Sequence, residues 1–152
     1  LKDRVREDIL LLAGPTEKPD SFLRSLMKQA SGKENQIIWS GMLEGDLKWG
    51  ALLAADSLIL PSHQENFGMV IAEALSVGTP VLLTDKVNLW REVVHSNAGM
   101  VANDDQAGID QLVQQWRNGA HVCCVKNTIS CFQEKLHISK TVDNIISLFP
   151  KE

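Results

Sequence analysis

Short apolar runs alternate with longer stretches of helical periodicity along this chain. Each run is nearly all hydrophobic, as expected of a strand that is covered on both faces of a sheet. Strands that alternate with helices are typical of a parallel α/β fold. The predicted strands are Ile9–Ala13, Gln36–Ser40, Ser57–Leu60, Pro80–Thr84 and Gly99–Ala102.

The amphipathic segments between and after these strands are predicted to be helices. Asp46 is placed to start the second helix, Gly78 to end the third, and Asp104 and Asp105 to cap the helix that begins at Gln106. We therefore expect one doubly wound, Rossmann-like α/β domain of about five parallel strands over residues 1–152. The predicted helices are Pro19–Ala30, Glu44–Ala54, Phe67–Val77, Asn88–His95, Gln106–Asn118, His121–Lys135 and Ser139–Leu148.

Composition narrows the class of protein. The chain has 152 residues, and its 44% hydrophobic content is that of a soluble globular domain. A net charge of -4 argues against nucleic acid as a partner. The absence of a long apolar run predicts no transmembrane segment. The cysteines are odd in number, and with no export signal visible they favour a cytoplasmic location. Cys124 and Cys131, seven residues apart, are interpreted as packing residues, and no metal-binding pattern is present.

The segment Ser62–Phe67 is the place where the sequence indicates chemistry. It follows the third predicted strand and precedes a helix, and ligands of open α/β sheets bind at such turns. The first turn of a helix has unpaired N–H groups and the positive end of the helix dipole. Gly68 lets a ligand approach the backbone closely. The N–H groups of Phe67, Gly68, Met69 and Val70 are therefore candidates for binding phosphate oxygens.

Two glutamates bracket this turn. Glu65 and Glu73 are eight residues apart, roughly 12 Å along a helix. The carboxylates of a glycosidase lie closer, about 5 to 9.5 Å apart, so this spacing suits two different parts of an elongated ligand. Carboxylates accept hydrogen bonds from vicinal hydroxyls of sugars and ribose. The alternative is that Glu73 is a solvated helix residue. Its small and apolar neighbours argue against that alternative.

The segment 61–104 resembles the donor-sugar motif of the group 1 glycosyltransferases, which are retaining GT-B enzymes of family 4. The resemblance covers most of the chain and is weaker near the C-terminus. The residues that carry it are Pro61, Ser62, Glu65, Phe67, Gly68, Glu73, Ala74, Leu75, Gly78, Pro80, Val81, Glu92 and Gly99.

This resemblance implies roles for particular residues. Glu65 is expected to contact hydroxyls of the transferred sugar and to be the catalytic residue, and Glu73 is expected to hold the ribose. Gly41 and Met42 resemble the loop that contacts the nucleobase. His63 is a candidate for a sugar or phosphate contact, with a plain surface histidine as the alternative. The donor is expected to be a nucleotide-diphosphate sugar, UDP-linked, and neither a metal nor another cofactor is expected.

The resemblance also implies that parts of the donor domain are missing. The family's donor domain begins with one further strand, a glycine-rich loop and two cations that hold the diphosphate. An N-terminal domain binds the acceptor, a glycan or a lipid-linked sugar. Without the first strand we expect the strand order 2-1-3-4-5. The intact enzyme is expected in the cytoplasm, at the inner face of a membrane. Phe132 and Phe149 are expected to leave apolar surface exposed and to favour self-association.

Two other functions remain open on the sequence. The chain could be a non-catalytic nucleotide-binding or interaction module that keeps the fold without turnover. It could also belong to another GT-B enzyme, such as a sugar-nucleotide epimerase or a phosphorylase. An epimerase would need a different acid/base constellation, and a phosphorylase would need a lysine for its pyridoxal cofactor.

Overall fold

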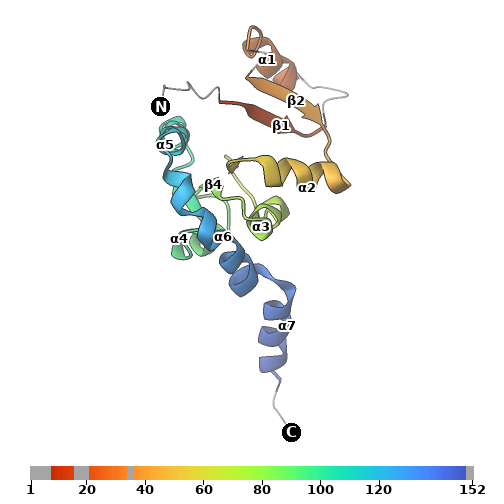
Figure 1. The fold of residues 1–152 in the computed structure, drawn as a ribbon, viewed down its shortest axis with the longest axis vertical. Coiled ribbons are helices and arrows are strands. Elements are labelled where there is room, and N and C mark those ends of the chain that lie inside the picture. The colour runs from red at the N-terminus through yellow and green to blue at the C-terminus, as the bar shows by residue number, and fades with distance from the viewer. Residues whose placement is uncertain (1–7, 16–20, 34–35, 150–152) are drawn as a thin grey trace, which may run out of the picture. The chain divides into compact units, whose positions relative to one another are not determined.

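The computed structural model describes residues 8–15, 21–33 and 36–149 (Figure 1). The chain forms two compact units, Leu1–Trp49 and Gly50–Glu152. The predicted start of the first helix, Pro19, lies outside the described residues.

The first unit contains a pair of parallel strands joined through a helix. β1 (Leu10–Ala13) pairs with β2 (Ile37–Gly41), and α1 (Ser21–Gln29) lies between them in the sequence. The Ser40 hydroxyl donates a hydrogen bond to the carbonyl of Leu12 at 3.2 Å. The two strands are therefore linked through a side chain as well as through their backbones.

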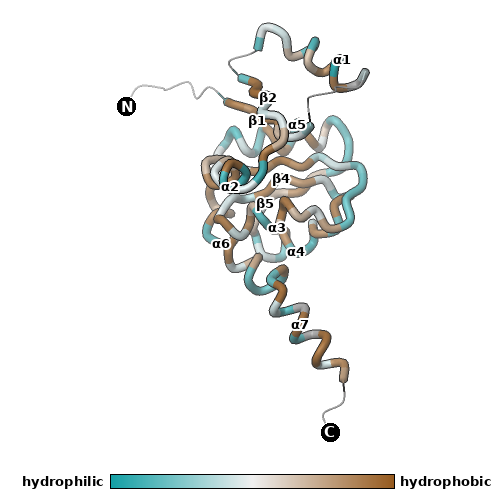
Figure 2. The backbone as a smooth tube through the Cα atoms, turned by 90° about the vertical axis from the view of Figure 1, so that its right-hand side faces the viewer, coloured by the Kyte–Doolittle hydropathy of each residue, from teal (hydrophilic) through white to brown (hydrophobic). Residues whose placement is uncertain are grey.

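The second unit is built on a three-stranded parallel sheet. β3 (Leu58–Leu60), β4 (Val81–Thr84) and β5 (Gly99–Ala102) pair in that order, with β4 in the middle. All four residues of β4 are buried, as the continuous apolar run predicts. Gly99 is required at its position because a Cβ there would collide with the carbonyl oxygen of Val81 on the neighbouring strand. Figure 2 shows β4 and β5 as hydrophobic segments inside this unit.

Helices follow each strand of this sheet and supply the rest of its core. Ile71 and Leu75 on α3, Leu83 on β4 and Val93 on α4 are fully buried in one cluster. The Thr79 hydroxyl donates to the carbonyl of Leu52 at 2.6 Å and ties the end of α2 to the start of β4. The helices are α2 (Gly45–Ala54), α3 (Met69–Ser76), α4 (Trp90–His95), α5 (Gln106–Arg117), α6 (Val125–Cys131) and α7 (Ile138–Ser147), with a 3-10 turn η1 (Ala120–Cys123) and a π-helical turn η2 (Phe132–Leu136).

The single helix predicted over His121–Lys135 is wrong. That segment is divided into η1, α6 and η2. His121 is buried, its ring stacks on Trp116 at a centroid distance of 5.7 Å, and its Nδ1 lies 3.1 Å from the Trp116 carbonyl oxygen. These contacts fold the chain back onto the end of α5, so the new helix starts only at Val125.

The parallel α/β class is confirmed. Within each unit the strand pairing agrees with the predicted order 2-1-3-4-5, since β2 lies beside β1 and β3, β4 and β5 pair in that order. The pairing of β1 with β3, which this order also requires, would join the two units and stays a prediction.

The C-terminal helix α7 extends away from the sheet of the second unit (Figures 1 and 2). Phe149 just beyond it is 69% exposed, as the prediction of exposed apolar surface requires. The same prediction is wrong for Phe132, which packs against the buried core because the π-helical turn directs it inward. Within the described ranges, none of the helices has both the length and the hydropathy needed to cross a membrane.

Candidate functional site

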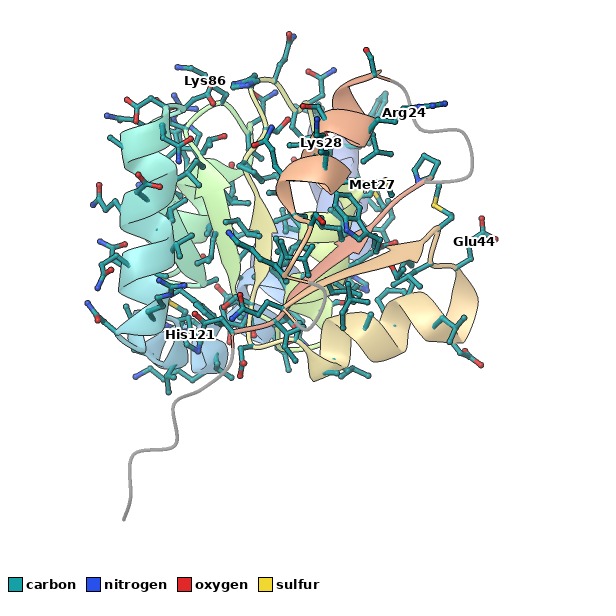
Figure 3. All side chains as sticks on the ribbon, turned by 90° about the horizontal axis from the view of Figure 1, so that it is seen from above. Arg24, Met27, Lys28, Glu44, Lys86 and His121 are labelled. Carbon is teal, nitrogen blue, oxygen red and sulfur yellow. The ribbon has the colours of Figure 1, made fainter. Side chains whose placement is uncertain are left out.

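Three loops meet at the carboxyl edge of the β3–β4–β5 sheet. The Thr84 hydroxyl at the end of β4 donates a hydrogen bond to the carbonyl of Ser62 after β3. The backbone N–H of Asp85 donates to the carbonyl of Ala102 at the end of β5, at 3.0 Å. In Figure 3, Lys86 marks this edge and His121 lies toward the opposite end of the unit. Hydrogen bonds therefore join the loops after β3, β4 and β5 at the edge where parallel sheets bind ligands.

Glu65 is held through both its backbone and its side chain. Its backbone forms a parallel bridge with Val87, in which its N–H donates to the Lys86 carbonyl at 3.4 Å and its carbonyl accepts from the Asn88 N–H at 3.1 Å. Its side chain reaches forward along the chain, so that Oε1 accepts the Gly68 N–H at 3.1 Å. The carboxylate therefore lies at the N-terminal end of α3, where the helix dipole favours a negative charge.

The predicted group of backbone N–H donors lies at this same helix start. The helix begins at Met69 rather than at Phe67 because Gly68 adopts left-handed backbone angles, φ 65° and ψ 66°. Of the four predicted donors, the Gly68 N–H already has the Glu65 carboxylate as its partner. Met69 and Val70 are the first two residues of the helix, whose N–H groups have no acceptor within the helix. The side chains of Phe67 and Met69 are exposed beside them.

Glu73 lies further along α3 and is half-buried. Ala72 and Ala74 on either side of it in the sequence are buried, so Glu73 occupies the border between the core face of the helix and the surface. Its backbone carbonyl accepts the Ser76 hydroxyl at 2.7 Å. Partial shielding from water strengthens a hydrogen bond between a residue and a ligand hydroxyl.

His63 has a partner that sequence reasoning missed. Its Nδ1 lies 2.7 Å from Oδ1 of Asp104, in the loop after β5. Asp104 and Asp105 were both expected to cap α5, but the cap is Asp105, whose carboxylate accepts the Gly108 N–H at 2.7 Å. No local pattern could reveal the His63–Asp104 pair because its two members are 41 residues apart.

Gly41 and Met42 lie in the first unit, at the carboxyl end of β2. Gly41 is the last residue of the strand and has a left-handed φ of 71°. Its carbonyl accepts the Gly14 N–H at 2.9 Å, which ties the loops after β1 and β2 together. Met42 is 60% exposed. Both residues thus lie at the carboxyl edge of their own sheet, and their contact with a nucleobase stays a prediction.

The prediction that Cys124 and Cys131 are packing residues is confirmed, since both are buried. Burial raises the pKa of the Cys124 thiol from its ordinary 9.0 to about 11, and the adjacent Cys123 adds to the shift. Burial also raises the pKa of Cys131, whose Sγ lies 3.8 Å from the Glu92 carbonyl oxygen. Both thiols are therefore protonated at neutral pH and are poor nucleophiles.

The fold matches that of solved structures. The structure of Anabaena HepE in complex with UDP-glucose superposes with a TM-score of 0.73 at 17% sequence identity, over 93% of this chain and 41% of that chain. Sucrose-phosphate synthase from Thermosynechococcus elongatus superposes with a TM-score of 0.72 at 18% identity, over 92% of this chain and 37% of that chain. These likenesses confirm the Rossmann-like α/β class.

Sequence comparison identifies the family. The family described as "Glycosyl transferases group 1" matches residues 1–122, and the chain belongs to it. An uncharacterized glycosyltransferase of Methanocaldococcus jannaschii is 30% identical over 70% of this chain and 28% of its own length. The lipopolysaccharide glucosyltransferase WaaG of Escherichia coli is 31% identical over 66% of this chain and 26% of its own length. The chain thus spans about a quarter of the length of these relatives.

Proposed function

We propose that this chain is the donor-binding part of a glycosyltransferase. The transferred sugar comes from a nucleotide-diphosphate sugar, UDP-linked, and passes to an acceptor hydroxyl with retention of configuration. The acceptor, a glycan or a lipid-linked sugar, binds to another domain of the whole protein at the cytoplasmic face of a membrane. The reaction uses no metal and no other cofactor.

The observation that carries this proposal is the position of Glu65. Its backbone is bridged to the loop after β4, and its carboxylate is turned onto the start of α3. A carboxylate held in this way presents its remaining lone pairs to sugar hydroxyls at the edge where ligands of such sheets bind. The Met69 and Val70 N–H groups beside it suit the diphosphate. HepE, which shares the fold, has been solved with UDP-glucose.

Glu73 supplies the second contact in this proposal. It follows Glu65 by eight residues along the loop and helix, so the two carboxylates address opposite ends of one elongated donor. Glu73 accepts hydrogen bonds from the ribose hydroxyls, and Glu65 accepts them from the transferred sugar. Gly41 and Met42 of the first unit contact the nucleobase.

Calorimetric titration of the chain with UDP tests the ribose contact. Hydrogen bonds to a charged group contribute about 1.5 to 3 kcal/mol, so Glu73→Ala should weaken UDP binding roughly 10- to 100-fold. Glu134→Ala is the matched control, because it removes the same charge from an exposed position in η2. Equal UDP affinity in wild type and Glu73→Ala would contradict the assignment.

Retention is tested with the whole protein by following hydrolysis of UDP-glucose. The donor carries α-linked glucose, so retention releases α-glucose first and inversion releases β-glucose first. Proton NMR separates the two anomers before they equilibrate. Initial formation of β-glucose would refute the retaining reaction and leave the donor-binding proposal intact.

A further inference from the structure

The pair formed by His63 and Asp104 spans the carboxyl edge of the second unit's sheet. His63 follows β3 and Asp104 follows β5, and β4 lies between those two strands. Neighbouring strands are about 4.8 Å apart, so the two loops start roughly 10 Å from each other. The contact of 2.7 Å between Nδ1 and Oδ1 therefore closes over the end of β4.

The contact determines what the histidine ring can offer a ligand. A carboxylate only accepts hydrogen bonds, so Asp104 requires the proton on Nδ1. In the neutral ring, Nε2 then has a lone pair and accepts a hydrogen bond. The two side chains differ in exposure: that of Asp104 is 15% exposed and that of His63 is 89% exposed. Asp104 is thus the shielded anchor, and the ring extends from it toward the solvent side of the edge.

We propose that His63 is a specificity-determining residue, which accepts a hydrogen bond at Nε2 from a hydroxyl of the transferred sugar, and that Asp104 positions it. This inference rests on the proposed function. Phosphate oxygens are acceptors, so they make no hydrogen bond with an Nε2 lone pair, whereas a sugar hydroxyl donates to it. His63 lies two residues before Glu65, the proposed sugar contact, and ten residues before Glu73, the proposed ribose contact.

A purely structural link between the loops is the competing explanation. Exposed ion pairs contribute little to stability, and these loops are already joined through Thr84 and Asp85. A structural link would act on the loops as a whole, so its loss would weaken the binding of every ligand at this edge. A sugar contact would act only on ligands that carry the sugar.

The test compares the binding of UDP, UDP-glucose and UDP-galactose by calorimetry. Asparagine at position 63 keeps a donor at the place of Nδ1 but does not reach the place of Nε2. Glutamine reaches the place of Nε2 with an amide oxygen. His63→Asn should therefore weaken the tighter-binding UDP-sugar about three- to tenfold, the loss of one neutral hydrogen bond, and leave UDP within twofold. His63→Gln keeps the acceptor but loses the contact with Asp104, so its affinity for the UDP-sugar should lie between those of the wild type and His63→Asn.

Two further variants complete the test. Asp104→Ala should reduce affinity for the UDP-sugar in the same direction as His63→Asn, because the ring loses its orientation. Gln64→Ala is the control: this exposed neighbour accepts the Ser62 hydroxyl through its backbone carbonyl, which the substitution keeps. Its affinity for all three ligands should match that of the wild type.

Each contrary result has a distinct meaning. Unchanged UDP-sugar affinity in His63→Asn overturns the inference, and so does an equal loss for UDP and the UDP-sugar, which indicates a structural link. A His63→Gln affinity no better than that of His63→Asn overturns the assignment to Nε2. If the wild type binds UDP as tightly as both UDP-sugars, the sugar makes no favourable contact with the protein, and the inference is overturned. A wild type that binds none of the three refutes the proposed function itself.

Discussion

Replacement of Gly68 by alanine perturbs the helix start that holds the candidate site. Gly68 has a φ of 65°, and an L-residue with a Cβ costs about 1 to 2 kcal/mol in that conformation. A Cβ at this position would lie 2.7 Å from Cδ1 of Ile71 and 3.2 Å from Cγ of Glu65. Ile71 is fully buried, so it has no solvent to move into. The substitution therefore combines backbone strain with a collision in the core.

The expected loss of stability follows from these two contributions. Displacement of Ile71 from its preferred rotamer costs about 0.5 to 1.5 kcal/mol. Together with the backbone strain, Gly68→Ala should lower the free energy of unfolding by about 1.5 to 3.5 kcal/mol. For a chain of this size each kcal/mol lowers the melting temperature by about 2 to 4 °C, so the melting temperature should fall by about 3 to 14 °C.

Urea unfolding of two further variants separates the contributions. Gly119→Ala is the matched control, because Gly119 has a φ of 79° but no atom within 4 Å of the place where a Cβ would lie. Gly119→Ala should lower the free energy of unfolding only by the contribution of backbone strain. Ile71→Val removes the colliding Cδ1, so Gly68→Ala should cost about 0.5 to 1.5 kcal/mol less in that background. Equal costs for the two glycine variants, with full additivity in the double variant, would refute the reasoning.

Two other perturbations test local features of the second unit. Asp105→Ala removes the cap that accepts the Gly108 N–H and should cost about 1 kcal/mol in urea unfolding, whereas the exposed Gln111→Ala should change stability by less than about 0.5 kcal/mol. The raised pKa of Cys124 means that the folded state keeps the thiol proton to higher pH than the unfolded state does. The contribution of this thiol to stability is therefore complete below pH 9 and is lost as pH rises toward 11. Over this range the free energy of unfolding, measured in urea, should fall less steeply with pH in Cys124→Ala than in the wild type. Identical slopes for the two proteins would contradict this prediction.

The strands of the second unit were predictable because burial on both faces leaves a direct mark on the sequence. Leu58–Leu60, Val81–Thr84 and Gly99–Ala102 all lie within the predicted runs. The start of α3 was less predictable. Its apolar periodicity extends back to Phe67, but the left-handed conformation of Gly68 delays the helix to Met69. A glycine permits that conformation without requiring it, so the sequence alone does not mark the boundary.

The segment after α5 could not be predicted because tertiary contacts override its helical pattern. His121 is a polar residue, and its burial against Trp116 depends on the packing of a folded unit. The π-helical turn that starts at Phe132 directs that ring toward the core and brings it 5.6 Å from His137, edge to face. Neither contact has a counterpart in local residue preference, so the pattern predicts one helix where the chain forms several short elements.

In the candidate site, the order of loop and helix was predictable from the sequence, so Glu65 lies in the loop before α3 and Glu73 within the helix. The roles of both glutamates stay predictions. The capping contact from Glu65 to the Gly68 N–H was not expected, and it places a carboxylate where a phosphate was predicted. The two are compatible, because a carboxylate has lone pairs beyond the one that accepts this N–H. Glu65 can therefore be oriented by the helix start and still accept sugar hydroxyls. The diphosphate is then left with the N–H groups of Met69 and Val70, and the negative charge of Glu65 beside them favours a donor whose sugar, rather than its phosphate, lies nearest to Glu65.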